Sequence, residues 1–462
     1  MKVALKKIRW RIIILLCTLQ IVSCEKDLEL EENVTLSPPN TPFQVTSENQ
    51  TFNDSILKQV LEEEFDLILR RKKGTESSKE ISGMEIDKSN PKKVYVHYLP
   101  WFQSKPYDGY WGQHWTMTNR NPDHIDAYGV NEVASYYNPL IGPYSSSDPD
   151  LQEYHFLLMK LAGVDGVIFD WYGSRNIHDY GLIKNATETF ISKLENVDLD
   201  FCIMYEDRVA YMDQPGNLNT PVTRAKVDFN YIKDVYFNSA NYLEFNNSKL
   251  ISIFGPHYLT NETDWNDIYN VFSNQDQPSL ISLWGLKNTL GNHFNGEFLW
   301  VAPDHLLAQD YYYSTYATNN DITIGSSYPG FHSFYEEGGW SDGINSWVLP
   351  RNNSYTFIET LNNSSYEDAD FIQIITWNDF GEGTMIEPTT QFGFTYLKLL
   401  QEYTGVSYNE NDLSTVVRLY QARKKYANNS RVMSLLDNSY GYMKQLRIKR
   451  VNKILQAINR YF

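Results

Sequence analysis

The chain has 462 residues, a length that allows two or three average domains or one large α/β barrel with insertions. Its formal net charge of −17 argues against an extended polyanion such as a nucleic acid as a partner. Aromatic residues make up 15% of the chain, and the 34 Tyr and 11 Trp suit either core packing or stacking on the flat faces of sugars.

The first 24 residues have the composition of a targeting segment. A basic start precedes an apolar run from Ile12 to Val22, which is short for a membrane span and typical of a signal peptide. The sequence IVSC at Ile21–Cys24 resembles the lipobox of bacterial lipoproteins, which implies cleavage before Cys24 and a lipid on its thiol. An ordinary signal peptide with an incidental cysteine is the alternative. We therefore expect residues 1–24 to be a lipoprotein signal peptide and the mature chain to be anchored to a bacterial outer membrane, at the cell surface or in the periplasm.

Residues 25–90 are polar, acidic and rich in Ser, Asn and Pro, which is typical of a tether. One short amphipathic helix is expected within them, because Ile56, Val60, Leu61 and Phe65 recur at helical spacing. With Cys17 removed and Cys24 lipidated, Cys202 is the last cysteine, so no intramolecular disulfide is expected in the mature chain.

From Val94 on, short apolar runs that favour strands alternate with segments that favour helices. The eight runs are KVYVHYLPWF, GVDGVIFDWYG, LDFCIMYEDR, KLISIFGPHYL, SLISLWGLKN, EFLWVAPDH, DITIGSSYPGF and FIQIITWNDFGEG. Strands that alternate with helices pair in parallel through right-handed crossovers, and eight such units close a (β/α)8 TIM barrel. The segment DPDLQEYHFLLMKLAG predicts one crossover helix, since Asp-Pro can begin it and Gly163 can end it. We therefore expect a catalytic barrel over residues 91–405.

Residues 406–462 predict a C-terminal extension of two or three helices. Val417 and Tyr420 share one apolar face, and Val451, Ile454 and Ile458 share another. Eleven Lys and Arg but only two Asp fall in residues 411–462, so this basic extension suits a solvated face or docking against the acidic barrel.

The carboxyl ends of nearly all eight runs carry aromatic, histidine or acidic residues, whereas their starts are plain. These end residues are His97, Trp101, Asp170, Trp171, Glu206, His257, Trp284, Asp304, Tyr328 and Asp379. In a (β/α)8 barrel the active-site residues lie at the C-terminal face and come from several strand ends. In a doubly wound sheet the ligand-binding residues lie only near the point where the strand order reverses. The pattern therefore favours a barrel with a catalytic or binding site at its C-terminal face.

The last run leads into a pair of carboxylates, Asp379 and Glu382, in a glycine-flanked turn. Two carboxylates in one cavity take different pKa values, which supplies a general base and a general acid, as hydrolysis of a glycosidic bond requires. The alternative is that one of the two acids caps the turn and the other is solvated. The preceding buried strand and the neighbouring Trp377 make this alternative less favourable. Glu387, before Pro388, is expected to bond backbone amides and hold the loop.

Several blocks of the sequence resemble glycoside hydrolase family 99, the endo-α-mannosidases, and the last of them also resembles the signature of family 71, the fungal α-1,3-glucanases. They are HYLPWF…DGYWGQHW, YYNPLIGPYSSSDPD, GVIFDWYG, SSYPGF and TWNDFGEGTMIEP, in the same order over roughly Val94 to Tyr403. The resemblance implies Glu382 as general acid and Asp379 as base. Family 99 has Asn-Glu where this chain has Asn378-Asp379, so it stays open whether Asp379 activates water or the 2-hydroxyl of the substrate.

The resemblance also implies that Tyr98, Trp101 and Trp171 line the sugar site and that Glu206 contacts substrate hydroxyls. Asp170 could also contact substrate hydroxyls, or it could accept hydrogen bonds from the barrel backbone or from a neighbouring Arg. Four further residues suit either a floor of stacking rings in the sugar site or packing within the loops. They are Trp111, His114 and Trp115 in the loop after the first run, and Tyr328 after the seventh run.

The residues offer no sign of a metal site or a cofactor site. His97 and His257 lie on separate runs without metal-ligand spacing, and no phosphate-binding glycine loop follows any run. We therefore predict an endo-acting glycosidase, rather than an exo-acting one, for α-mannan or α-glucan type glycans. It would need no cofactor, and other glycan-utilisation proteins are its expected partners beside the membrane and its carbohydrate substrate. The alternatives are a non-catalytic glycan-binding lipoprotein and a glycosyltransferase-like relative.

Overall fold

The structure, a computed structural model, describes residues 42–45, 51–74, 83–194, 196–212, 220–273, 276–340, 347–364 and 369–462. All of these belong to one unit, Thr41–Phe462. The expected signal peptide and Cys24 lie outside the described residues. Across the described ranges, no helix combines the length and the apolar character that a membrane crossing needs.

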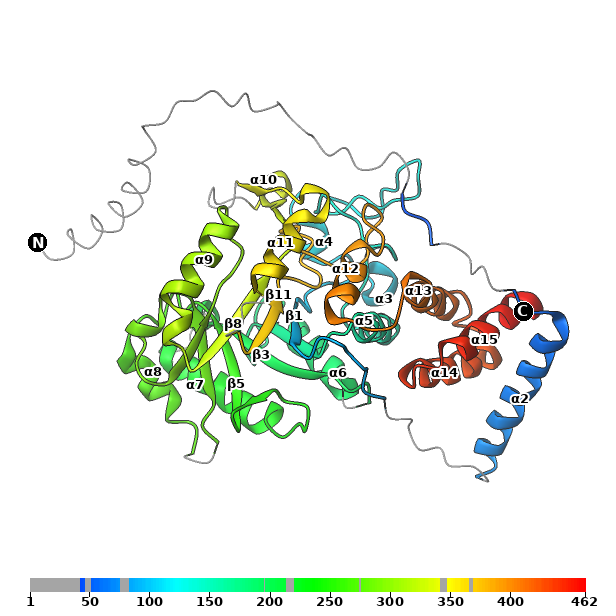
Figure 1. Ribbon diagram of the computed structural model, residues 1–462, viewed down its shortest axis with the longest axis horizontal. Helices are drawn as coiled ribbons and strands as arrows, with labels where there is room; N and C mark the ends of the chain where they lie inside the picture. The colour runs from blue at the N-terminus through cyan, green and yellow to red at the C-terminus, as the bar shows by residue number, and fades with distance from the viewer. Residues whose placement is uncertain are drawn as a thin grey trace, which may run out of the picture. The chain divides into compact units, whose positions relative to one another are not determined.

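Eight parallel strands form a closed sheet at the centre of this unit (Figure 1). They are β1 (Lys93–Tyr98), β2 (Gly166–Trp171), β3 (Asp200–Glu206), β5 (Ser248–Phe254), β6 (Ser279–Leu283), β7 (Phe294–Phe298), β8 (Ile322–Ser327) and β11 (Phe371–Ile374). The strands pair in chain order, β1 pairs with β11, and every pair in the ring is parallel. The expected (β/α)8 TIM barrel is therefore confirmed. Three short strands lie outside the ring, β4 (Glu244–Phe245), β9 (Phe331–His332) and β10 (Val348–Leu349).

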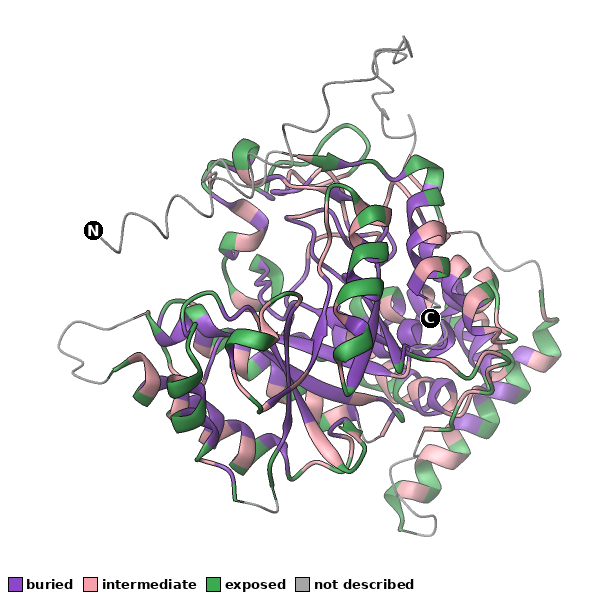
Figure 2. Ribbon diagram, turned by 60° about the vertical axis from the view of Figure 1, so that its left-hand side comes forward, coloured by how far each residue is buried: buried purple, intermediate pink, exposed green. Residues whose placement is uncertain are grey.

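Helices follow the strands around the barrel. The longer ones are α5 (Pro149–Leu161), α6 (Tyr180–Leu194), α7 (Pro221–Tyr231), α8 (Glu262–Tyr269), α9 (His305–Thr315), α11 (Tyr355–Ser364) and α12 (Thr395–Thr404). The crossover from β6 to β7 holds only the 3-10 turn η3 (Lys287–Thr289). Figure 2 shows the barrel strands buried and the helices exposed on their outer faces. The core thus lies inside the barrel and between the strands and this helical layer.

Helix α5 has the ends that the sequence predicts. The side chain of Asp148 caps its first turn by accepting a hydrogen bond from the Asp150 amide at 3.0 Å. Gly163 follows the helix with φ of +75°, and a Cβ atom there would lie 2.5 Å from Thr404 Oγ1 of α12. Only glycine fits this turn, because the position combines a left-handed backbone with close packing.

Strand β7 begins earlier than the sequence predicts. The expected run started at Glu297, but the strand spans Phe294–Phe298 and includes Gly296. A Cβ atom on Gly296 would lie 2.3 Å from the Ile322 carbonyl oxygen of the adjacent strand β8. Asn295-Gly296 looks like a turn in the sequence, yet the glycine is there because the two backbones approach closely.

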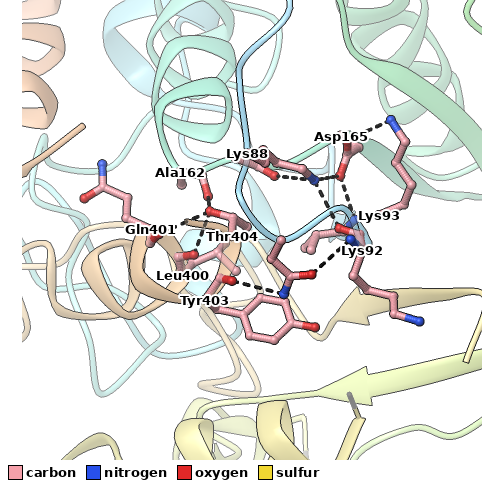
Figure 3. A network of polar contacts seen from close by, with 12 residues as sticks. Lys88, Lys92, Lys93, Ala162, Asp165, Leu400, Gln401, Tyr403 and Thr404 are labelled. Atoms are coloured by element: carbon pink, nitrogen blue, oxygen red, sulfur yellow. Dashed lines mark hydrogen bonds and ion pairs between the residues drawn. The ribbon is translucent and has the colours of Figure 1, made fainter. Parts of the chain in front are cut away.

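Paired charges hold the N-terminal ends of the first two strands together (Figure 3). The Asp165 carboxylate, just before β2, accepts from the Val94 amide at 2.8 Å and from Lys93 Nζ at 3.0 Å, and it also pairs with Lys88. A cavity of about 400 Å³ opens at this end of the barrel, lined in part by the same residues. Because the ion pairs of Asp165 with Lys88 and Lys93 join the two strands, this end serves stability, as is usual for that face of a barrel.

The C-terminal helices are α13 (Glu410–Lys425), α14 (Ser430–Lys444) and α15 (Ile448–Tyr461). Helix α13 packs on α5 of the barrel, and α14 and α15 also pack on α2 (Asp54–Lys72), a helix from the expected tether (Figure 1). Glu64 of α2 is fully buried there and accepts from Asn438 Nδ2 at 2.9 Å, Tyr442 OH at 3.2 Å and Arg450 Nη2 at 2.6 Å. A buried carboxylate with these donors ties residues 54–72 to the C-terminal extension.

Candidate active site

A cavity of about 620 Å³, a size typical of ligand sites, opens at the C-terminal ends of the barrel strands. Its lining residues come from the ends of most of the barrel strands and from the loops that follow them. They are Leu99, Trp101, His114, Asp170, Tyr172, Met204, Glu206, Asp207, Arg208, Phe254, His257, Tyr258, Trp300, Tyr335, Trp340, Asp379 and Glu382. The predicted pair Asp379 and Glu382 therefore faces one cavity, together with three further carboxyl-bearing residues, Asp170, Glu206 and Asp207.

The turn after β11 fixes the position of this pair. The Asp379 amide donates to Thr376 Oγ1 at 2.8 Å, and Asp379 Oδ1 accepts from the Glu382 amide at 2.9 Å. Gly383, with φ of +66°, allows the chain to reverse directly after Glu382. Because the Asp379 side chain bonds to the backbone of the residue that bears the second acid, the two carboxyl groups are held as one unit.

The surroundings of the two acids separate their pKa values. Burial raises the pKa of Asp379 to about 6, and the amides of Glu382 and Gly381 limit this rise by donating to the carboxylate. Burial and the adjacent negative charge of Asp379 raise the pKa of Glu382 well above its usual value. At neutral pH Asp379 is therefore charged while Glu382 keeps its proton, the division of labour that a general base and a general acid need.

A second carboxyl pair, Asp170 and Glu206, lines the same cavity at the ends of β2 and β3. Glu206 Oε2 lies 3.2 Å from Arg208 Nε, and the Tyr172 hydroxyl approaches Glu206 Oε1 at 3.5 Å. Burial raises the pKa of Glu206 to about 7, while Arg208 opposes the rise. Burial and the Glu206 charge raise the pKa of Asp170 well above its usual value, and its Oδ1 has no hydrogen-bonding partner in the described part of the chain. These groups can bind the hydroxyls of a sugar by donating and accepting hydrogen bonds.

Aromatic side chains form one wall of the cavity. The Trp101 ring stacks on the His114 ring, with centroids 4.2 Å apart and planes 4° apart. The His114 Nε2 atom lies 3.3 Å from Asp179 Oδ2, and the Trp340 ring meets the imidazole edge-on. Trp101 and His114 thus lie where the sequence predicts, on a wall suited to the apolar face of a sugar ring.

Four of the expected substrate-binding residues are fully buried and do not line the cavity. Trp171 packs on Tyr231 behind β2, and the Tyr98 hydroxyl bonds to His155 Nδ1 at 3.0 Å behind β1. Successive side chains of a strand point to opposite faces, so Asp170 faces the cavity while its neighbour Trp171 faces the helices.

The other two buried residues lie in loops. Trp115 donates its Nε1 to the Tyr144 carbonyl at 2.8 Å, and Tyr328 packs among Phe331, Leu349 and Ile375. A third loop residue, Trp111, is partly exposed and donates to Asp123 at 2.9 Å, also outside the cavity lining. For these three positions, the loop-packing alternative describes the structure better than the floor of stacking rings does.

Glu387 follows the turn that carries Asp379 and Glu382 and is fully buried. It was expected to bond backbone amides, but its Oε2 accepts from the Tyr144 hydroxyl at 2.6 Å and its Oε1 lies 3.2 Å from His155 Nε2. The Tyr144 hydroxyl in turn accepts from Asn378 Nδ2 at 3.3 Å, beside Asp379. Glu387 therefore supports the turn through side chains.

Several lining residues were missed by the sequence analysis. Trp300 and Arg208 follow strand ends and could have been found there, since both lie within two residues of a strand. Tyr335 and Trp340 come from the long loop after β8, where no periodic pattern marks them. In the described ranges no group of three or more His, Cys, Asp or Glu is placed to hold a metal ion.

Comparisons with known proteins place the chain beside one family of glycosidases, although no protein-family model matches it. The glycoprotein endo-alpha-1,2-mannosidase-like protein of Danio rerio is 23% identical over 286 residues, which cover 56% of this chain and 60% of that protein. The glycoprotein endo-alpha-1,2-mannosidase of Mus musculus is 23% identical over 345 residues, which cover 66% of this chain and 70% of the mouse protein. This chain therefore spans less than two thirds of the length of the zebrafish relative.

A solved structure of the GH99 endo-alpha-mannosidase from Bacteroides thetaiotaomicron is similar over 69% of this chain and 98% of that chain, with a TM-score of 0.53 and 18% identity. A second structure of that enzyme, in complex with bis-tris-propane, gives a TM-score of 0.51 over the same shares and also 18% identity. At this identity the likeness shows the barrel fold. Together with the sequence relatives, it confirms the resemblance to family 99 that the motifs indicated.

Proposed function

We propose that this chain is an endo-acting glycoside hydrolase that cleaves α-linked glycans of the mannan type. One observation supports this most: Asp379 and Glu382 face the same cavity from one rigid turn, with Asp379 charged and Glu382 protonated at neutral pH. The mouse relative is named a glycoprotein endo-alpha-1,2-mannosidase and the zebrafish relative a glycoprotein endo-alpha-1,2-mannosidase-like protein, which favours mannose over other sugars.

In the proposed reaction the proton of Glu382 passes to the glycosidic oxygen as the bond to the anomeric carbon breaks, so the leaving sugar departs as an alcohol. Asp379 removes a proton from the oxygen that attacks this carbon. The neutral Tyr335 hydroxyl, 3.4 Å from Glu382 Oε1, orients the acid. Asp170, Glu206 and Arg208, at the ends of β2 and β3, bind sugar hydroxyls, and Trp101 stacks on a ring.

Product analysis tests this function. The wild-type chain, incubated with α-mannans and α-glucans and followed by proton NMR, is expected to release oligosaccharides with new reducing ends from α-mannan. The Asp379→Asn variant, nearly identical in shape, is expected to release none at the same protein concentration. If the wild-type chain binds these glycans but cleaves none of them, the chain is a glycan-binding protein and the proposal is wrong.

We also propose that the mature chain is attached to a bacterial outer membrane through Cys24, as the IVSC sequence suggests. Growth of a bacterial host with radioactive palmitate is expected to label the wild-type chain and not a Cys24→Ser variant. Equal labelling of the two chains would contradict the anchor.

A further inference from the structure

Two exposed tyrosines stand at the edge of the cavity on its β3–β5 side. Tyr258 lines the cavity and is 45% exposed, and Tyr211 beside it is 44% exposed. Their ring centroids are 5.3 Å apart, and the Tyr211 hydroxyl donates to the Tyr258 carbonyl oxygen at 3.1 Å. The two rings therefore form one exposed aromatic surface that continues the wall of the cavity outward.

The loop that carries Tyr258 is held by a buried charge. The Asp207 carboxylate, only 1% exposed, accepts from the amides of His257, Tyr258 and Leu259 at 3.0, 2.7 and 2.8 Å. The Leu259 carbonyl also accepts from the indole of the buried Trp265 at 2.6 Å. A carboxylate with three amide donors fixes the backbone under Tyr258, so the exposed ring stands on a rigid support.

The segment that carries Tyr211 is fixed in the same way. It follows the 3-10 turn η1 (Asp207–Ala210), whose Arg208 points into the cavity. Arg175 donates to the carbonyl oxygens of Val209 and Met212, on either side of Tyr211. An exposed ring normally needs no such support, because single apolar side chains are common on protein surfaces. Here two rings are placed together, and the turn that positions Arg208 also positions Tyr211.

We propose that Tyr211 and Tyr258 form a sugar-binding platform that takes a further residue of the glycan whose cleaved bond lies at Asp379 and Glu382. Rigid aromatic faces lose little conformational entropy on binding and suit the apolar face of a pyranose ring. Tyr258 stands at the rim of the cavity and Tyr211 lies beyond its lining, so only a glycan chain long enough to extend past the rim can reach both rings. The inference rests on the proposed glycosidase function and makes the substrate an extended α-linked oligosaccharide.

The test compares kcat/KM for α-linked mannooligosaccharides of increasing length. Substitutions Tyr258→Ala and Tyr211→Ala are each expected to lower kcat/KM for the longest substrate about three- to tenfold more than for the shortest one cleaved, mainly through KM. Tyr258→Phe keeps the ring and is expected to restore the preference for length. Tyr355→Ala removes a tyrosine that is 57% exposed and absent from the cavity lining, and serves as the matched control.

An equal loss at all lengths, or no loss, would overturn the platform. So would a Tyr258→Phe variant as impaired as Tyr258→Ala, since the hydroxyl rather than the ring would then be responsible. If the wild-type chain cleaves nothing, the proposed function fails on its own. The platform is then judged by calorimetric affinity for long and short oligosaccharides, where the same variants must reduce the gain from length.

Discussion

The pH dependence of kcat/KM follows directly from the environment of the two acids, and Tyr335→Phe perturbs one limb of it. The Tyr335 hydroxyl donates to Glu382 at 3.4 Å and so lowers the pKa of that acid against the rise caused by burial. Without this donor the pKa of Glu382 rises, and the alkaline limb of the profile moves to higher pH. The acid limb reports Asp379, which must be charged, and stays near pH 6.

The structure also sets the magnitudes. The rise in the pKa of Asp379 from 3.8 to about 6 corresponds to about 3 kcal/mol against its charged form. Below that pH, kcat/KM is expected to fall about tenfold for each pH unit. A hydrogen bond to a charged group contributes about 1.5–3 kcal/mol, but the contact to Tyr335 is long, so we expect less. About 1 kcal/mol moves the alkaline limb upward by about 0.7 pH units.

The assay measures kcat/KM from pH 4 to about pH 10 for the wild-type chain and Tyr335→Phe, with stability checked at each pH. Tyr328→Phe is the control, because that tyrosine is buried outside the cavity and its loss should move neither limb. An alkaline limb that stays in place or moves to lower pH would refute the assignment of Glu382 as the protonated acid. A wild-type profile without an acid limb near pH 6 would refute the role of Asp379.

Three further predictions concern residues around the site and the packing of the helices. Glu387→Gln is expected to lower the free energy of unfolding by about 1–3 kcal/mol in urea denaturation, because His155 loses its carboxylate partner. The same variant is expected to have a lower kcat. An unchanged kcat would contradict the conclusion that Glu387 supports the turn. Arg450→Ala is expected to cost about 2–3 kcal/mol in the same assay, because Glu64 stays buried and loses the two hydrogen bonds that Arg450 donates to it, and no change would contradict the docking of α2. Trp171→Phe is expected to cost about 1–2 kcal/mol with little change in KM, and a raised KM at unchanged stability would restore it to the sugar site.

The barrel, and the position of Asp379 and Glu382 at one cavity, could be predicted because their signals are local. Eight apolar runs whose carboxyl ends carry aromatic, histidine or acidic residues predict the ring of strands. Asp379 and Glu382 are three residues apart in one turn after the last strand. Nothing distant has to be known to bring these two side chains together. The same holds for helix α5, whose capping Asp148 and terminal Gly163 adjoin it in sequence.

The rest of the site depends on strand register and on long loops. Asp170 and Trp171 are adjacent in a strand that is buried throughout, so the sequence offers no alternation of polar and apolar residues to tell which one faces the cavity. Tyr335 and Trp340 reach the cavity from a loop whose path depends on tertiary packing. The supporting contact of Glu387 joins residues more than two hundred positions apart, so it appears only when the fold is known.

The most direct test of the central claim, that Glu382 donates its proton to the leaving sugar, compares two substrates in the Glu382→Gln variant. With an oligosaccharide, whose leaving group needs protonation, the variant should lose about 10²–10⁴-fold in kcat. With the corresponding glycosyl fluoride, whose leaving group needs little help, the loss should be far smaller, while Asp379→Asn should remain impaired on both. An equal loss of the Glu382→Gln variant on the two substrates would contradict the account.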